Sequence, residues 1–581
     1  MARLFNDPAS FVDEMIEGFT AAAGRWIVPA PGGVVRAVED GIPTVALITG
    51  GGSGHYPAFG GLVGPGLAHG AVMGNVFASP STQQVQDVVS ACDRGRGALM
   101  VYGNYAGDVL NFSAAQTQLR EKGLDVRTVV VTDDIASGGA DGRDTRRGIA
   151  GDLVVLKIAG AAAASGRHLD EVERLARLAN ERTVSLGVAF GGCTLPGARE
   201  PLFSVPAEKM ALGLGIHGEP GLEELDIPTA DELAHLLVTR LLADIPPAWA
   251  ESGATVIPVL NGLGAIKVEE LFVVFRTVAR LLTEGGLTVV DPEVGELCTS
   301  FDMEGCSLTL FFPDDEMRAL WSAPAESAGY RKSKTESSSV PGVPRATAAA
   351  AIVAPASEGH VGDDSRAAGE EIARMLEHAA SAIDEAADDL GRLDAIAGDG
   401  DHGIGMRRGV VAAREAARVA AAEGRGAGGV LHRAADAWAD KAGGTSGVLW
   451  GQMLHAAASE IGDSAAVSGD TAARAVTAAG DVLRAFGGAE VGDKTMVDAV
   501  VPFVEEFAAR VAQGEDPVDA WRIAADRATE AAAATAEMSA RRGRARTHGD
   551  RSLGTPDPGA TSFALICTTI GREASVKEDA R

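Results

Sequence analysis

Cysteines are scarce in the sequence, and basic residues are outnumbered. Five of the 581 residues are cysteine and none stands in a CxxC pair, so a disulfide framework and a cysteine zinc site are both unexpected. Lysine and arginine together number 51 against 80 aspartates and glutamates, which gives a formal net charge of −29. Nucleic acids and anionic membranes require clustered positive charge, so we expect neither as a partner.

Two further features are missing. The first ten residues have no apolar segment of the kind that a secretory signal needs, which together with the few thiols predicts a cytoplasmic protein. Residues 41–86 contain no Asp, Glu, Lys or Arg. Glycines and prolines, among them Pro57, Pro65 and Pro80, interrupt that stretch, so it predicts buried strands and loops, not a membrane span.

Glycine, by contrast, is abundant. The chain has 73 glycines, well above the usual share of about 7%. Each glycine costs backbone entropy on folding, so a chain this rich in glycine needs close approaches of its backbone. The places where glycines cluster are therefore the first candidates for function.

The pattern divides the chain into a multidomain protein. Residues 1–325 alternate short β-branched runs with helical stretches, which predicts an α/β half of two lobes. Residues 326–366, rich in Pro, Ser and Ala without apolar periodicity, predict a linker. Residues 367–575 carry alanine and acidic residues at helical spacing and predict an all-α domain.

Particular elements follow from the same periodicities. In the first half we predict strands at 44–50, 97–102, 126–132 and 254–260, and helices at 83–93, 152–165 and 170–185. In the second half we predict helices at 368–386, 410–422, 427–438, 471–486, 499–513 and 517–540.

Three glycine-framed loops in the first half hold His55, Asp108 and His217. Each has an ordinary alternative: a tight turn, a helix N-cap and a surface loop, respectively. Together they provide candidates for an acid, a base and a nucleophile with no metal motif beside them. The three loops therefore indicate a catalytic site.

A different cluster lies near the start of the helical half, where Asp394, Asp399 and Asp401 fall within eight consecutive residues. Three carboxylates this close favour a hard cation such as Mg²⁺ or Ca²⁺, although a solvated acidic loop is the alternative. An EF-hand is excluded, because Val410 stands where the bidentate Glu is needed. Later glycine loops are typical of phosphate-receiving helix junctions or of simple helix caps, and a cation beside them indicates a nucleotide.

These motifs resemble the two-part dihydroxyacetone kinases along nearly the whole chain outside the linker. The matched stretches in the first half are GGGSGHYP (50–57), NYAGDVLNF (104–112) and GIHGEPG (215–221). Those in the second half are GDGDHG (398–403), GGTSG (443–447), VGDKTM (491–496) and DPGA (557–560). The resemblance implies a ketose-binding α/β domain and an ATP-binding domain built as a closed barrel of helices.

The resemblance also implies roles for residues of the first half. His217 matches the histidine that holds the ketose covalently as a hemiaminal, and Asp108 matches the base that accepts the proton of the phosphorylated hydroxyl. His55 matches the histidine that assists proton movement, and Gly52 contributes backbone contacts to the substrate. The chain is thus expected to phosphorylate a primary hydroxyl of a short-chain ketose, either dihydroxyacetone or a tetrulose such as erythrulose.

In the second half the resemblance implies ATP and Mg²⁺. Asp394, Asp399 and Asp401 match the magnesium carboxylates. The positions that match the nucleotide site are His402, Gly403, Ile404, Gly405, Thr445, Ser446, Gly487, Met496, Arg544, Asp557, Pro558 and Gly559. A homodimer, in which the helical domain of one copy serves its own or the other's ketose site, is also expected.

One position departs from the family pattern. Where the family usually has a lysine that contacts the substrate, this chain has Gly103. Loss of the long cation opens space, which supports the hypothesis of a longer ketose such as erythrulose. The alternative is that another residue replaces the lysine, and both remain open at this point.

Three other functions compete with an ATP-dependent ketose kinase. A phosphoprotein could be the phosphoryl donor, but that arrangement normally uses separate chains and this chain is fused. A nucleotide-sugar cyclase side activity is a second alternative, and a ketose-sensing regulatory protein is a third. Sensors tend to lose the catalytic groups, and this chain keeps both histidines and all four aspartates.

Overall fold

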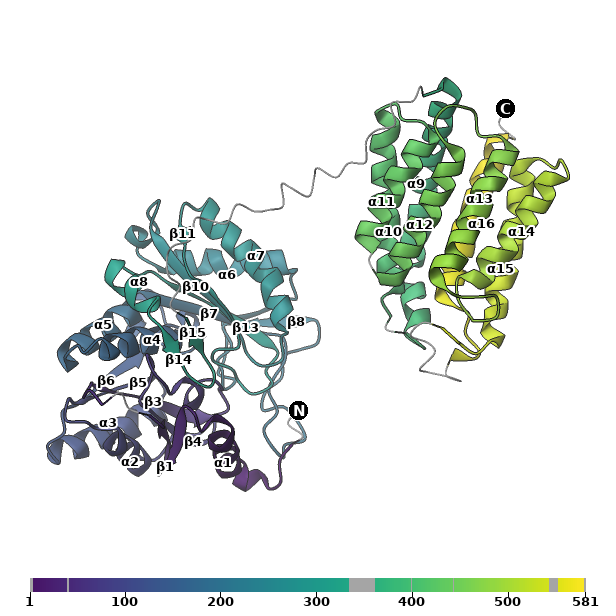
Figure 1. Cartoon of the computed structure of the whole chain (residues 1–581). Helices are drawn as coiled ribbons and strands as arrows, with labels where there is room; N and C mark the ends of the chain where they lie inside the picture. Colours follow the sequence, from purple (N-terminus) through teal and green to yellow (C-terminus); the bar gives the residue numbers. More distant parts are fainter. Residues whose placement is uncertain are drawn as a thin grey trace. The chain divides into compact units, whose positions relative to one another are not determined.

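The computed structural model describes residues 4–38, 41–333, 361–398, 400–442, 444–542 and 552–578. The chain forms two units, Met1–Gly342 and Val343–Arg581, each with its own interior (Figure 1). The first is α/β with two large sheets and a two-stranded one, and the second is helical, which confirms the predicted fold class. The exact boundaries at residues 325 and 367 stay predictions.

The first lobe is a six-stranded sheet with the order β1-β2-β4-β3-β5-β6. Its strands are β1 (Ile27–Ala30), β2 (Gly33–Arg36), β3 (Ala46–Ser53), β4 (Gly70–Val76), β5 (Ala98–Gly103) and β6 (Val126–Val131). From β4 to β6 the neighbours are parallel. The carboxyl ends of β3 and β5 therefore lie at one edge, where ligands of α/β sheets usually bind.

Helices cover both faces of this sheet. The two helices α2 (Thr82–Cys92) and α3 (Ala106–Glu121) bury their apolar sides against one face. On the other face lie α4 (Gly151–Ala164) and α5 (Leu169–Glu181), of which α4 is buried along nearly its whole length. The short α1 (Phe11–Ala23) packs beside β1. A parallel sheet needs this double cover because both of its faces are apolar.

The second lobe is a mixed sheet with the order β11-β10-β13-β7-β8-β9, and β12 pairs with β10. Its strands are β7 (Thr183–Ala189), β8 (Lys209–Leu212), β9 (Glu223–Asp226), β10 (Thr255–Gly262), β11 (Thr288–Val289), β12 (Glu293–Gly295) and β13 (Gly305–Phe311). Its helices are α6 (Ala230–Asp244) and α7 (Val268–Glu284), and the half ends with α8 (Asp315–Trp321), β14 (Ala325–Glu326) and β15 (Arg331–Lys332).

One predicted helix of this half was too long. The expected helix 170–185 ends at Glu181, and Thr183 already begins β7. The run that follows is rich in β-branched residues and is buried on both faces, which favours a central strand.

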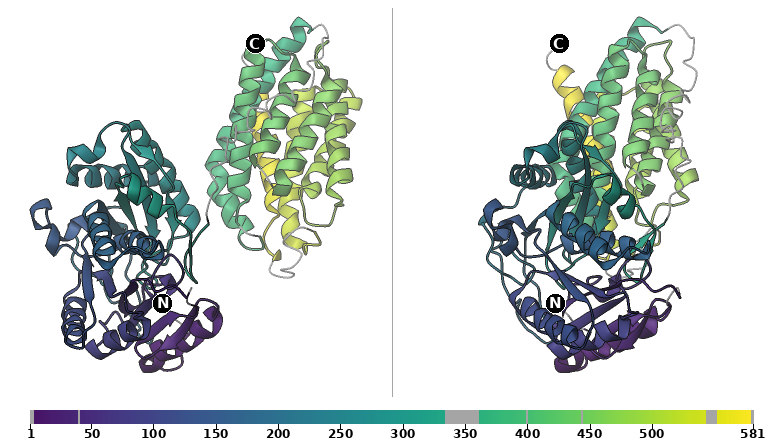
Figure 2. Two further views of the ribbon diagram at one scale, coloured as in Figure 1. Left: turned by 60° about the vertical axis from the view of Figure 1, so that its left-hand side comes forward. Right: turned by 90° about the vertical axis from the view of Figure 1, so that its left-hand side faces the viewer.

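The helical unit is a closed ring. Each of its long helices packs on the next along the chain, and the last packs on the first (Figure 2). They are α9 (Asp363–Asp394), α10 (His402–Ala422), α11 (Ala427–Ala442), α12 (Gly444–Ile461), α13 (Gly469–Gly487), α14 (Val497–Ala512), α15 (Pro517–Ala534) and α16 (Pro558–Glu578). Because consecutive helices run in opposite directions, alternate junctions lie at the same end of the ring.

Three predictions in this unit were incomplete. The helices α12 and α16 were missed, because their first turns are rich in glycine and hydroxyl residues that lower helix propensity. The helix predicted from residue 410 begins at His402. A Cβ on Gly403 would come within 1.9 Å of the Ala387 carbonyl oxygen, so tight packing against α9 requires glycine there.

None of the helices in the described ranges combines the length with the hydropathy that crossing a membrane would take.

Candidate active site

Two histidines from different sheets meet in the first unit. His55 follows the carboxyl end of β3, and His217 lies in the loop between β8 and β9. Their Nε2 atoms are 3.1 Å apart. The Nδ1 atom of His55 lies 2.7 Å from the Thr299 carbonyl oxygen, and the Phe77 ring stacks on its imidazole. The predicted residues His55 and His217 are thus brought into direct contact.

His55 is held neutral by its surroundings. Burial of its side chain lowers its pKa to about 3, and the nearby charge of His217 lowers it as well. A carbonyl oxygen only accepts hydrogen bonds, so the contact with Thr299 places a proton on Nδ1 of His55 and leaves its Nε2 as an acceptor.

A carboxylate orients the second histidine. Glu219 accepts a hydrogen bond from the backbone N–H of His217, and its Oε1 lies 3.1 Å from Nδ1 of the ring. Burial raises the pKa of Glu219, but the hydrogen bond and the charge of His217 outweigh burial and hold it at about 2. Arg147, itself paired with Asp134, lies 3.8 Å from the other carboxylate oxygen. The ionised Glu219 therefore fixes a proton on Nδ1 of His217.

The third predicted residue, Asp108, lies in the first turn of α3, just beyond the end of β5. Its Oδ1 is buried and has no hydrogen-bond partner among the described residues. Burial raises the pKa of this carboxyl, while a hydrogen bond from Ser79 and the charge of His217 lower it. Tyr105, three residues before Asp108, packs edge-on against the His217 ring with 4.8 Å between the centroids. Asp108 is thus a carboxyl with free hydrogen-bonding capacity near the histidine pair.

The predicted substrate glycines lie at the ends of the same two strands. A Cβ on Gly52, in β3, would come within 2.7 Å of the Ala78 backbone nitrogen, so the chain needs glycine there. Gly103 is the last residue of β5 and is buried. A Cβ at Gly103 would meet the Tyr105 ring at 3.2 Å and Oδ2 of Asp152 at 3.3 Å.

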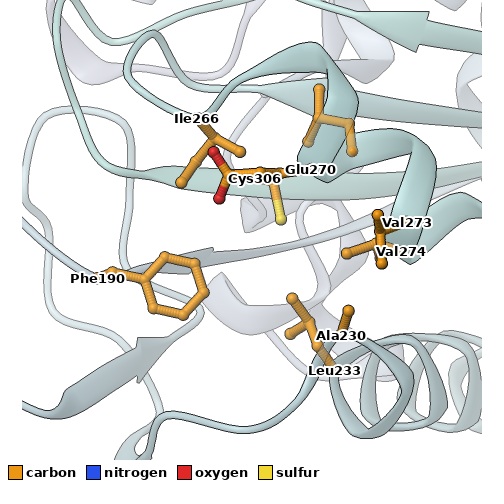
Figure 3. A pocket seen from close by; sticks show the side chains of 9 residues that line it. Phe190, Ala230, Leu233, Ile266, Glu270, Val273, Val274 and Cys306 are labelled. Atoms are coloured by element: carbon orange, nitrogen blue, oxygen red, sulfur yellow. The ribbon is translucent and has the colours of Figure 1, made fainter. Parts of the chain in front are cut away.

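A cavity of about 230 Å³ lies away from the histidine pair, against α6 and α7 of the second lobe (Figure 3). Its lining is apolar apart from Glu270 and Cys306. It includes none of the predicted site residues, and a small polyhydroxylated ligand needs several polar groups in its pocket. The histidine pair therefore remains the candidate active site.

The predicted nucleotide residues lie at one end of the helical ring. They belong to the α9–α10, α11–α12, α13–α14 and α15–α16 junctions, and helices of alternating direction bring those junctions together. His402 Nε2 lies 3.0 Å from the Ser562 hydroxyl, and a Cβ on Gly559 would lie 3.3 Å from Cβ of Met496. The remaining described members are in the same first or last turns: Gly403, Ile404, Gly405, Thr445, Ser446, Gly487 and Pro558.

Buried ionisable groups occupy this rim. Asp557 accepts a hydrogen bond from the Ala560 N–H in the first turn of α16, and burial raises its pKa to about 7. Lys494 is buried with φ of 61° and donates to the carbonyl oxygens of Met538 and Ser552. The lysine thus ties the α13–α14 loop to the residues that precede α16.

Of the predicted magnesium ligands, Asp394 ends α9 and Asp401 immediately precedes α10. Asp394 Oδ2 accepts a hydrogen bond from the Gly400 N–H, which draws the loop between the helices around it. Asp399 and Arg544 lie outside the described residues, and the residues that are described contain no group of three metal-ligating side chains. Aspartate oxygens are the donors that Mg²⁺ prefers, so the chemistry of the set fits this ion.

Several participants were not singled out from the sequence: Glu219, Tyr105, Phe77 and Thr299. Glu219 could have been found from its place two residues after His217, and Tyr105 from its place in the motif with Asp108. Thr299 lies 244 residues from its partner His55, and nothing local to it indicates that contact.

Comparison with known proteins extends over both units. Residues 17–329 match the Dak1 domain and residues 396–572 match the DAK2 domain. The chain is 52% identical to D-erythrulose kinase of Mycolicibacterium smegmatis, over 98% of each chain. It is 50% identical to L-erythrulose kinase of Pectobacterium atrosepticum, over 98% of this chain and 96% of that protein.

A solved structure shares the whole architecture. The dihydroxyacetone kinase of C. freundii in complex with AMP-PNP and Mg²⁺ is 28% identical, with a TM-score of 0.57, and the match covers 98% of this chain and 99% of that one. Two family models in tandem, together with full-length relatives at half identity, show that the chain belongs to the dihydroxyacetone kinase family.

Proposed function

We propose that the chain is an ATP-dependent kinase that phosphorylates a hydroxyl of a short-chain ketose held on His217. The observation that carries this proposal is the facing pair of Nε2 atoms, 3.1 Å apart, beside the partly unpartnered carboxyl of Asp108. The similarity to erythrulose kinases over the full chain supports both the reaction and the substrate class.

The hydrogen bonds of the pair assign its protons. Thr299 fixes one proton on Nδ1 of His55, and Glu219 fixes one on Nδ1 of His217. Two Nε2 atoms at 3.1 Å would repel if both carried lone pairs, so a single proton lies between them. Because burial lowers the pKa of His55, that shared proton is placed on Nε2 of His217, and ionised Glu219 lies beside Nδ1 of the same ring.

This arrangement suits covalent capture of a ketone. The proton passes from Nε2 of His217 to Nε2 of His55, and the freed lone pair attacks the carbonyl carbon. As the nitrogen–carbon bond forms and the carbonyl π bond breaks, His55 returns the proton to the oxygen. The hemiaminal carries a hydroxyl, and the imidazolium charge next to Glu219 is the same before and after the step.

Captured in this way, the ketose presents a hydroxyl to Asp108. A buried carboxylate with a raised pKa is a stronger base than one in water, and it accepts the hydroxyl proton as the oxygen attacks. A polyol such as glycerol has no carbonyl for His217, so reactivity selects ketoses along with shape.

The rim of the helical ring would hold the nucleotide. ATP supplies the phosphoryl group and Mg²⁺ neutralises its charge. Asp394, Asp399 and Asp401 would hold the metal, and the first turns of α10, α12 and α16 would direct backbone N–H groups to the phosphates. A related full-length structure with AMP-PNP and Mg²⁺ supports ATP over a phosphoprotein donor.

A coupled ADP-release assay tests this function. Wild-type protein with Mg²⁺ and ATP is expected to turn over dihydroxyacetone or erythrulose and to leave glycerol unused. The relatives are named for opposite erythrulose enantiomers at similar identity, so both enantiomers are assayed. A His217→Ala variant should lose turnover and the ketose adduct in the intact mass; an unchanged adduct and unchanged kinetics would contradict the mechanism.

The same assay separates the other candidates. ADP formed without a ketose, or turnover that needs a phosphoprotein, would overturn the proposal, and incubation with FAD and Mn²⁺ checks for cyclase activity. Binding of a ketose without any turnover would favour a sensor. The predicted homodimer is tested separately by light scattering of the full chain.

A further inference from the structure

An aspartate with no assigned role lies beside the active site. Asp152 occupies the first turn of α4 and is 5% exposed. Its Oδ1 is buried and has no hydrogen-bond partner among the described residues. A buried polar atom left unpartnered costs about 1–3 kcal/mol, so such an atom calls for a reason.

The surroundings of Asp152 connect it to the catalytic groups. Its Oδ2 lies 3.3 Å from the position that a Cβ on Gly103 would take, and the Tyr105 ring that packs on His217 lies 3.2 Å from the same position. The charges of Asp133 and Asp108 add to burial in raising the pKa of Asp152 well above its usual value. Burial raises the pKa of the Cys298 thiol, and the charge of Asp152 raises it further. Cys298 precedes Thr299, whose carbonyl oxygen holds His55.

The neighbouring carboxyl Asp133 is a useful contrast. It is fully buried as well, but both of its oxygens accept backbone hydrogen bonds, from Ile149 and Gly151. Asp133 therefore has a structural role in starting α4. Asp152, the residue directly after Gly151, has no such partners among the described residues and faces Gly103, the position that carries no side chain.

We propose that Asp152 determines substrate specificity, by forming a hydrogen bond with the C4 hydroxyl of a tetrulose bound beside Gly103. The inference rests on the proposed ketose kinase and deepens it. The carboxyl can donate to that hydroxyl or accept from it, so binding of the tetrulose gives the buried side chain a hydrogen-bond partner. Dihydroxyacetone has no fourth carbon and gives the side chain no such partner, which makes it the weaker ligand.

Calorimetric titration without nucleotide tests this inference, because its result does not depend on which hydroxyl accepts the phosphate. The ligands are D-erythrulose, L-erythrulose, dihydroxyacetone and 1,3-dihydroxybutan-2-one, which lacks the C4 hydroxyl. Wild type should bind the preferred erythrulose about tenfold more tightly than the deoxy compound, the value of one hydrogen bond. In Asp152→Leu this ratio should fall to one, with dihydroxyacetone binding unchanged within about threefold.

Two further variants distinguish recognition from folding. Asp152→Asn keeps an amide that can bond the hydroxyl and should restore most of the ratio. Gly103→Lys introduces a cation that pairs with Asp152, and it should weaken erythrulose binding while dihydroxyacetone still binds. Replacing an unpartnered buried polar group with an apolar one should leave the melting temperature equal or higher.

Several results would overturn the proposal. In Asp152→Leu, these are an unchanged ratio of the affinities for erythrulose and the deoxy compound, or an equal loss of affinity for all ketoses, with or without a lower melting temperature. In Gly103→Lys, it is erythrulose binding as tight as in wild type. If wild type binds no ketose, the proposed function itself fails, and that outcome is seen before any variant is compared.

Discussion

The Nε2 atoms of His55 and His217 lie 3.1 Å apart although 162 residues separate them in the chain. One histidine follows a strand of the first sheet and the other lies in a loop of the second, so the pair exists only when both lobes are folded and packed. The Ser300 hydroxyl, which donates to the Ile216 carbonyl oxygen, holds the second loop against the residues that contact His55.

Glu219→Gln should weaken covalent capture of the ketose. The substitution removes the negative charge that compensates the His217 imidazolium, so the adduct and kcat/KM should both fall, by about tenfold or more for a lost charged hydrogen bond. Intact-mass spectrometry measures the adduct. Glu223→Gln, at an exposed carboxylate of β9, is the control. Equal adduct yields in both variants would contradict the role of Glu219.

Asp108→Asn should separate ketose capture from turnover. Without the carboxylate, kcat should fall by about a hundred- to ten-thousand-fold, the usual range for a general base, while the adduct on His217 still forms. Steady-state kinetics and intact mass measure the two effects. The control is Asp170→Asn, an exposed aspartate of α5. Loss of the adduct together with kcat would assign Asp108 to binding instead.

Ser79→Ala should move the acidic limb of the pH profile. Burial raises the pKa of Asp108 and the hydrogen bond from Ser79 lowers it, so removing the hydroxyl raises the pKa further. The base is active when deprotonated, and the acidic limb of kcat/KM should therefore shift to higher pH than in wild type. A shift to lower pH, or none, would mean that Asp108 does not control this limb.

Asp394→Ala should reduce turnover and raise the Mg²⁺ requirement without affecting ketose binding. The residue lies in the helical unit, whereas all residues of the candidate ketose site lie in the α/β unit. Activity titrated with Mg²⁺ and calorimetry with erythrulose measure the two properties. Asp389→Ala, an exposed position of the same helix, should behave as wild type. Weakened ketose binding in Asp394→Ala would contradict separate sites.

Asp557 should make the helical unit less stable as the pH rises. Its folded-state pKa is raised from 3.8 to about 7, so between these values the folded chain keeps a proton that the unfolded chain has lost. The stabilisation, on the order of 4 kcal/mol, is present in full below pH ~4 and is lost by pH ~7. Calorimetric unfolding of Asp557→Asn, which can still cap α16, should lack this dependence. If the unfolding free energy of Asp557→Asn depends on pH as steeply as that of wild type, Asp557 is not the group responsible.

The sequence indicated the candidate side chains better than their arrangement. Glycine-framed loops pointed to His55, Asp108 and His217, because a backbone that must approach a ligand leaves a local signature in glycine. The partners of those residues leave no such signature. Thr299 and Arg147 belong to no motif in the sequence, and they reach the site only when the first unit has folded. The start of α10 and the whole of α12 and α16 were missed because packing overrides the propensity of glycine.

Asp152 shows the same limit in another form. Its sequence context reads as a helix that is buried nearly throughout, where an acidic residue in the first turn is unremarkable. Only the structure shows that Oδ1 of its carboxyl is buried without a partner among the described residues and that Oδ2 lies 3.3 Å from the position of a Cβ on Gly103.

Because the helices of the ring alternate in direction, its other three connections lie at the end opposite the predicted nucleotide residues. The connections there, between α10 and α11, α12 and α13, and α14 and α15, contain none of the predicted nucleotide or metal residues. Gln513 in the last of them is exposed. A fluorophore or a surface tether attached at that connection would lie at the end of the ring opposite the predicted nucleotide residues. This end is therefore suited to labelling or immobilising the protein for single-molecule work.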